Sequence, residues 1–112
     1  MTVKRILCAA QLRRIPTQFS WVDPRLAFDG HLGRLDTHAA TLYLLLVTVA
    51  DAQGLSYYSE ATLARRLRLS AAQLGAARQQ LIELQLVAYG APVYQVLALP
   101  SAISAAPPTP AP

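Results

Sequence analysis

The stretch from Ser59 to Leu84 most constrains the fold, because it holds two helical patterns separated by a short break. Ser59 precedes the first pattern, with Glu60 in its first turn, and Ser70 precedes the second. A serine there accepts hydrogen bonds from backbone N–H groups that lack a partner inside the helix. In the second pattern, apolar residues recur every three or four positions, as on one buried helix face: Leu74, Ala77, Leu81 and Leu84. The sequence therefore predicts two consecutive helices that share a core.

The outward faces of these two helices differ in chemistry. Leu63 and Leu67 share the inner face of the first helix, and arginines occupy its outward side and the following turn: Arg65, Arg66 and Arg68. Arginine forms forked hydrogen bonds with phosphate and with guanine. The outward side of the second helix carries small, amide and acidic residues: Ala72, Gln73, Ala76, Gln79, Gln80 and Glu83. The first helix thus favours contacts with phosphate, although both faces also suit an ordinary solvated surface.

The flanking sequence predicts one more long helix and three strands. "DTHAATLYLLLVTVADAQG" (Asp36–Gly54) has a capping residue at Asp36 or Thr37 and apolar residues all round its middle. Such a helix is buried on all sides, either as the central helix of the core or under a partner subunit. "GLSYYS" predicts a strand, and "LVAYG" and "VYQVLAL", joined by a turn at Gly90 and Pro92, predict a hairpin. We therefore expect an α+β domain over residues 36–99.

The two ends of the chain differ from this domain in composition. Residues 1–35 form a basic and aromatic extension, in which Asp23 and Pro24 begin a short helix and Trp21 is expected to anchor the segment to the domain. Residues 100–112 hold five of the eight prolines and no charge, which predicts an extended, mobile end. This tail is a simple linker or a proline-rich segment that docks on another protein.

Composition argues against several classes of protein. A chain with 54% hydrophobic and 14% charged residues is not generally disordered. The apolar run Leu42–Val47 is far shorter than the roughly 20 residues of a bilayer-spanning helix, and the first residues do not resemble a signal peptide, so we expect a cytoplasmic protein. One cysteine, Cys8, allows no intrachain disulfide and no cysteine-based zinc site. His31 and His38 have no partners at catalytic or ligand spacing, so we expect neither an enzyme nor a cofactor.

The charge of the chain favours an anionic partner. Ten basic and six acidic residues give a net charge of +4, and nine of the ten basic residues are arginine. Most of the basic residues outside the Arg65–Arg68 cluster lie in the first third of the chain: Lys4, Arg5, Arg13, Arg14, Arg25 and Arg34. A basic balance attracts nucleic acid but does not by itself identify it.

The order helix, strand, helix, helix, strand, strand resembles a winged helix-turn-helix domain, and the resemblance covers Asp36 to Leu99. "ATLARRLRLSAAQLGAARQQLIELQLV" is similar to the family pattern "lA..l.ls...v...l..L...glv", with Ala64 at the small position and Leu69 in the turn. The longer pattern "IPTQFSWVDPRL…YLLLVTVADAQGLSYYSEATLARRL" also resembles short winged-helix proteins of bacterial mobile elements and plasmid replication initiators.

The resemblance implies that the second helix of the pair lies in the major groove of DNA and that the final hairpin is the wing. Phosphates would then be contacted by Arg65, Arg66, Arg68 and an N-terminal arm with Lys4, Arg5, Arg13 and Arg14. Groove-facing residues would be Ser70, Ala72, Gln73, Ala76, Gln79 and Gln80. This chain departs from the family's DNA-binding members, because the first half of that helix has no arginine to read guanine and the turn "YGAP" is uncharged.

We therefore expect a weakly specific or sequence-tolerant binder of double-stranded DNA that forms a homodimer. Its role would be that of a small bacterial transcriptional regulator, or of an accessory or initiation factor of a mobile element. The alternative is a winged-helix module that binds proteins and not DNA.

Overall fold

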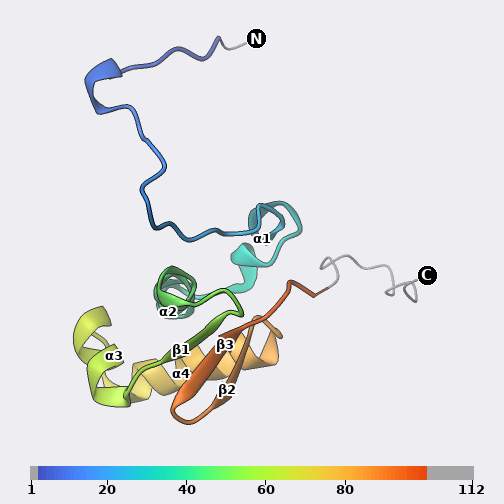
Figure 1. The fold of residues 1–112 in the computed structure, drawn as a ribbon. Coiled ribbons are helices and arrows are strands. Elements are labelled where there is room, and N and C mark those ends of the chain that lie inside the picture. The colour runs from blue at the N-terminus through green and yellow to red at the C-terminus, as the bar shows by residue number, and fades with distance from the viewer. Residues whose placement is uncertain (1–2, 101–112) are drawn as a thin grey trace.

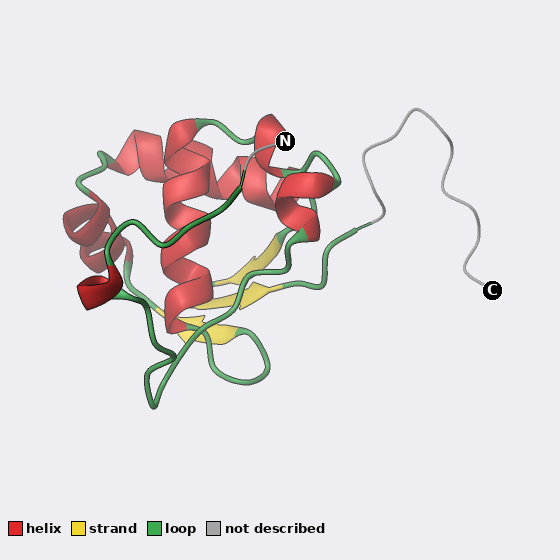
Figure 2. Cartoon of the chain, turned by 90° about the horizontal axis from the view of Figure 1, so that it is seen from above, coloured by secondary structure: helices red, strands yellow, loops and turns green. Residues whose placement is uncertain are grey.

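The computed structural model describes residues 3–100 of the 112-residue chain, so the expectations for residues 101–112 lie outside the described part. Within it the protein is α+β, with α-helices on one side of a three-stranded antiparallel sheet (Figures 1 and 2). The elements are η1 (Ala9–Gln11), α1 (Arg25–Phe28), η2 (Leu32–Arg34), α2 (Thr37–Val49), β1 (Leu55–Tyr57), α3 (Glu60–Leu67), α4 (Ala71–Glu83), β2 (Val87–Gly90) and β3 (Val93–Val96). From α2 onward, their order and type agree with the sequence prediction.

Side-chain caps fix where the three longer helices begin. The Asp36 carboxylate accepts a hydrogen bond from the Ala39 N–H at 2.8 Å at the start of α2, and the Ser59 hydroxyl accepts one from the Thr62 N–H at 3.1 Å at the start of α3. Ser70 and Gln73 form a reciprocal capping box at the start of α4. The predicted caps at Ser59 and Ser70 are confirmed, and Asp36 is the one used of the two considered for α2.

The turn between α3 and α4 holds one arginine in the left-handed backbone conformation. Arg68 follows α3 with φ of 57°, in the left-handed region, and its N–H donates a hydrogen bond to the Ala64 carbonyl. Residues other than glycine adopt this conformation at a cost of about 1 kcal/mol or more. Arg68 therefore lies in the connection between the two helices, as the sequence predicted.

The sheet has the strand order β1-β3-β2, with Ser56 of β1 and Tyr89 of β2 both opposite Tyr94 of β3. Gly54 links this sheet to the end of α2, because its carbonyl accepts the Val96 N–H at 2.8 Å. A Cβ at Gly54 would lie 2.6 Å from the Val96 carbonyl oxygen, and its φ is 84°. Only glycine fits this close approach of two backbones.

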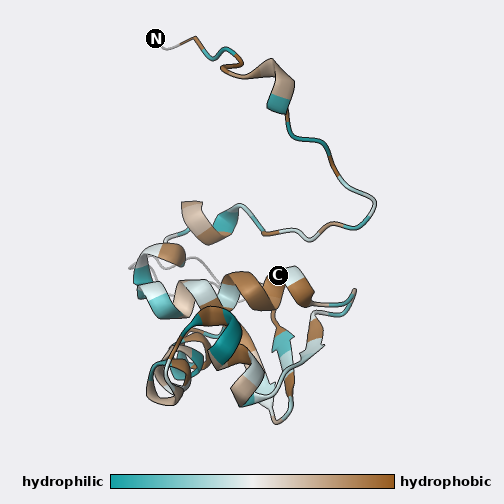
Figure 3. Cartoon of the chain, turned by 90° about the vertical axis from the view of Figure 1, so that its left-hand side faces the viewer, coloured by the Kyte–Doolittle hydropathy of each residue, from teal (hydrophilic) through white to brown (hydrophobic). Residues whose placement is uncertain are grey.

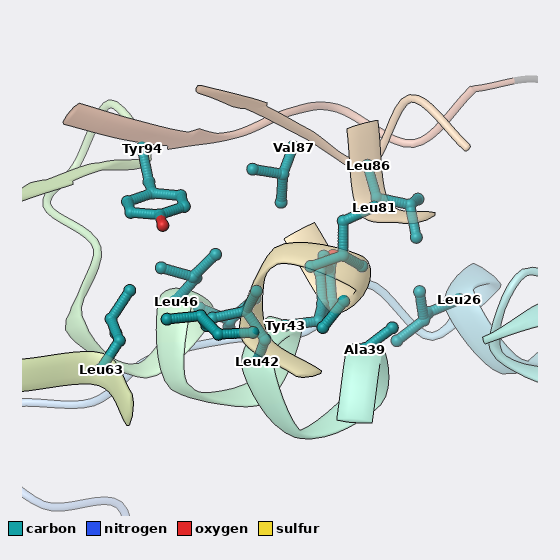
Figure 4. Close-up of a cluster of buried hydrophobic side chains, with 13 residues drawn as sticks. Leu26, Ala39, Leu42, Tyr43, Leu46, Leu63, Leu81, Leu86, Val87 and Tyr94 are labelled. Carbon is teal, nitrogen blue, oxygen red and sulfur yellow. The ribbon is translucent and has the colours of Figure 1, made fainter. Parts of the chain in front are cut away.

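The core lies between α2, α4 and the sheet (Figure 4), where Leu42 and Leu46 of α2 meet Leu81 of α4 and Tyr94 of β3. Of the two expectations for α2, burial on all sides within this one chain is wrong at Leu44, which is 62% exposed; cover by a partner subunit stays a prediction. No other element of the described residues covers that side of the helix. The core also reaches into the predicted N-terminal extension, since Leu26 of α1 and His31 are buried.

Residues 3–22 form an exposed segment that extends away from the domain (Figures 1 and 3). The expectation that Trp21 anchors this segment is wrong, because its side chain is 73% exposed. The observed attachment is polar: the Ser20 hydroxyl donates a hydrogen bond to the Thr48 carbonyl of α2 at 2.7 Å. The short helix predicted after Asp23-Pro24 is confirmed as α1 (Arg25–Phe28), although Pro24 and not Asp23 occupies the cap position.

Candidate nucleic-acid interface

The arginines at the end of α3 form an exposed cationic cluster, here defined as Arg65, Arg66 and Arg68. Figure 3 turns the α3 side of the molecule toward the viewer and shows hydrophilic residues on the outer surface there. The two ion pairs found within residues 3–100 involve other arginines, namely Arg25 with Asp23 and Arg78 with Glu60. Cations at a helix C-terminus are favoured by the helix dipole, which gives the cluster a structural role as well. Its guanidinium groups are nevertheless free to bind an external anion.

The exposed face of α4 follows this cluster directly. Ala72, Gln73, Ala76 and Gln79 are all exposed, and Ser70 stands at its start. The Gln73 side-chain oxygen accepts the Ser70 N–H at 2.9 Å, while the Ser70 hydroxyl accepts the Gln73 N–H at 3.1 Å. A bidentate contact with adenine uses both the oxygen and the nitrogen of the side-chain amide. Gln73 can therefore read adenine in this way only by opening the capping box.

Gln80 does not belong to the exposed face of α4, which corrects the sequence prediction. Its side-chain oxygen accepts the Asp36 N–H at 2.9 Å, and its side-chain nitrogen donates to the Arg34 carbonyl at 3.3 Å. The position lies one helical turn from both Ala77 and Leu84, at the border of the buried stripe. Gln80 thus joins α4 to the start of α2 and is not available to DNA. Of the three glutamines predicted to face a groove, Gln79 has no side-chain hydrogen bond within residues 3–100.

Sequence reasoning missed the role of Arg78, which connects α3, α4 and the hairpin. Its Nη1 donates hydrogen bonds to the Glu60 carboxylate and, at 2.9 Å, to the Tyr94 hydroxyl. The guanidinium carbon also lies 4.6 Å from the centre of the Tyr89 ring. Burial opposes the positive charge, but the hydrogen bonds with Tyr94 and Glu60 outweigh it and raise the pKa of Arg78. The sequence indicates this role only through the position of Arg78, which directly follows Ala77 of the buried stripe.

The basic residues of the N-terminal arm, here residues 3–22, do not join the α3 cluster. Lys4, Arg5, Arg13 and Arg14 are exposed, and the arm extends from the α1 and α2 side of the domain, away from the hairpin turn (Figures 1 and 3). The arm has four cations and no acidic residue, whereas six arginines and six carboxylates balance over residues 23–99. The whole net charge of the chain is therefore carried by the arm.

The described part of the chain was also searched for metal sites, reactive side chains and membrane-spanning helices. No group of three or more His, Cys, Asp or Glu side chains within residues 3–100 is arranged to hold a metal ion. Cys8 is free and exposed. His31 is buried with its Nε2 unpaired in this structure. None of the described helices is long and apolar enough to cross a membrane.

Comparisons of the chain with protein-family models, with curated proteins and with solved structures found no match in any of the three.

Proposed function

We propose that this protein binds double-stranded DNA with weak sequence specificity, through a winged helix-turn-helix arrangement of α3, α4 and the β2–β3 hairpin. The observation that carries the proposal is the exposed cluster Arg65, Arg66 and Arg68, which has no ion-pair partner within residues 3–100. Its guanidinium groups lie where the connection enters α4, so they would contact phosphates beside a groove that receives this helix.

The exposed face of α4 favours close approach of the helix to the major groove more than hydrogen bonds to the bases. Ala72 and Ala76 are small, so the helix backbone would come near the floor of the major groove, and alanine methyl groups would meet thymine methyl groups. Gln79 is the amide on this face with no side-chain hydrogen bond within residues 3–100, whereas the side-chain oxygen of Gln73 and both polar atoms of Gln80 are engaged. Specificity would accordingly be low.

The arm would supply a second set of contacts. The hairpin turn at Ala91-Pro92 has no charge, so the wing adds little electrostatic attraction. Lys4, Arg5, Arg13 and Arg14 are free to follow the phosphate backbone or a neighbouring groove once the domain is bound.

We also propose that the protein acts as a homodimer in the cytoplasm and without catalytic chemistry. Leu44 leaves an apolar side of α2 open, and a second copy there would cover it. Two domains would double the DNA surface that one small domain buries. The proposed role is that of a bacterial transcriptional regulator, or of an accessory or initiation factor of a mobile element.

The alternative is a protein-interaction module of the same fold. It is favoured by the uncharged hairpin turn and by the alanines on the exposed face of α4, which suit an apolar protein surface as well as a DNA groove. A protein partner bound there would give an affinity that depends little on salt.

The affinity for duplex DNA, measured at a series of salt concentrations, distinguishes the DNA-binding protein from the protein-interaction module. The logarithm of the affinity should fall linearly with the logarithm of the salt concentration, and Arg65→Ala with Arg66→Ala should lower that slope by about one unit per lost phosphate contact. Arg34→Ala is the matched control, because Arg34 is exposed but lies on η2. Absence of salt-dependent binding to any duplex at low ionic strength would contradict the DNA-binding proposal.

A further inference from the structure

A groove of about 580 Å³ lies apart from α3 and the exposed face of α4, between the root of the arm, the C-terminal half of α2 and the segment that follows β3. Its aromatic and aliphatic walls include Phe19, Trp21, Tyr43, Val47, Leu97 and Leu99. This volume is in the range of about 300–1,000 Å³ that is usual for ligand-binding clefts.

Two aromatic side chains in the walls of this groove lack a covering partner within the described residues. Phe19 is 67% exposed and Trp21 is 73% exposed, although both line the groove. Large aromatic side chains left open to water in one place mark interaction sites.

The charged side chains around the groove and the Ser20 hydroxyl already have partners. The Asp23 carboxylate is paired with the Arg25 guanidinium at 2.7 Å. The Asp51 carboxylate accepts the N–H groups of Gln53 and Leu55, and the Ser20 hydroxyl is bonded to Thr48. The groove therefore suits an occupant without charge.

The segment of this chain that follows the described residues has that chemistry. Residues 100–112 carry no charged side chain, and "PPTP" (Pro107–Pro110) is proline-rich. Proline-rich sequences favour the polyproline II helix, which docks in grooves lined by aromatic side chains. The segment also starts at the right place, because Leu99 lines the groove and Pro100 follows it directly.

We propose that the proline-rich segment Pro107–Pro110 docks in this groove of its own chain, against Phe19 and Trp21. The six residues 101–106 between it and Pro100 span up to about 20 Å, enough to turn back into the groove. Tethering so close gives the segment a high effective concentration, on the order of millimolar for a short linker. Since residues 19–22 form the root of the basic arm, occupancy also sets the direction in which the arm leaves the domain.

The chain has a single tryptophan, Trp21, whose fluorescence reports directly on the groove. A full-length variant with Pro107→Ser, Pro108→Ser and Pro110→Ser should show emission at longer wavelength and faster acrylamide quenching than the unaltered protein. A peptide of residues 100–112 added in excess to that variant should reverse both changes. Phe19→Ala should weaken the difference, whereas Phe28→Ala, which removes another exposed phenylalanine that lies outside the groove, should leave it intact.

Three results would overturn the proposal. One is identical emission and quenching in the two proteins, with no response to the peptide. Another is a response of the variant to the peptide although the unaltered protein already resembles the variant, which would make the groove a site for another chain. The third is a difference that grows with protein concentration, which would place the segment of a second copy in the groove. The core lies within residues 26–94, so thermal unfolding should show the same fold in all proteins compared.

Discussion

The guanidinium of Arg78 on α4 donates a hydrogen bond to the buried hydroxyl of Tyr94 on β3, at 2.9 Å. This contact holds the hairpin against the helix proposed to enter the DNA groove. Glu60 binds the same Nη1 from α3, so one side chain sets the arrangement of three elements.

Replacing Arg78 should therefore destabilise the protein without removing a surface contact. Arg78→Met keeps the apolar stem but leaves the Tyr94 hydroxyl buried without a partner, and we expect the free energy of unfolding to fall by about 2 kcal/mol. Urea unfolding measures this. The control Arg34→Met, at an exposed site, should change it by less than about 0.5 kcal/mol, and an equal loss in both variants would contradict the role given to Arg78.

The burial of Tyr94 predicts sensitivity to alkaline pH. Burial raises the pKa of Tyr94 above the ordinary value of 10.0, although the hydrogen bond from Arg78 acts the other way, and burial also raises the pKa of Tyr43. The folded protein thus holds these phenolic protons more tightly than the unfolded chain does. The resulting stability is fully present below about pH 10 and is lost as the pH rises through the folded-state values. Urea unfolding at a series of alkaline pH values should show a smaller loss for Tyr94→Phe, and no such difference for the exposed Tyr57→Phe.

Arg68→Gly should move stability and DNA affinity in opposite directions. Glycine adopts the left-handed φ of this position without strain, so we expect the free energy of unfolding to rise by about 1 kcal/mol. The salt slope of DNA binding should fall by about one unit, because one phosphate contact is lost. A parallel fall of stability and affinity would show instead that the Arg68 side chain holds the turn together.

Gln79 and Gln80 are neighbours that should behave differently. Gln80→Ala removes two hydrogen bonds to the connection before α2 and should lower the free energy of unfolding by about 1 kcal/mol, with no effect on DNA affinity beyond that. Gln79→Ala should leave stability unchanged and alter the preference among duplex sequences. Selection of bound duplexes from a random pool checks the second part, and an unchanged preference would remove Gln79 as a base reader.

The proposed dimer is tested at Leu44. Its side chain is already exposed, so Leu44→Gln should leave the fold intact and convert a dimer to a monomer. Mass measured in solution over a range of concentrations gives the result, with Tyr57→Thr on the exposed side of the sheet as control. An unaltered protein that stays monomeric at high concentration would contradict the dimer.

The parts of the fold that were predictable depend on neighbouring residues in the chain. Asp36, Ser59 and Ser70 cap helices by binding backbone three residues ahead, so the sequence alone indicates them. The periodic stripe of α4 likewise identified its buried face.

The parts that were not predictable depend on residues brought together by the fold. Gln80 and Arg78 look like surface residues until Arg34, Asp36 and Tyr94 are placed beside them. Trp21 is the opposite case, since it was expected to anchor the N-terminal segment, but its side chain is 73% exposed. A residue's type limits what it can bind, whereas its partners are set by the packing of distant segments.

The separation of charge described for this chain has a kinetic consequence. With the net positive charge on the arm and a balanced domain behind it, the molecule has a strong electric dipole. Near any polyanion it experiences a torque that turns the arm forward, so the first collision involves the arm and not α3 or α4. Salt would then slow this steered encounter, and it would also weaken the phosphate contacts proposed for Arg65, Arg66 and Arg68 in the bound state.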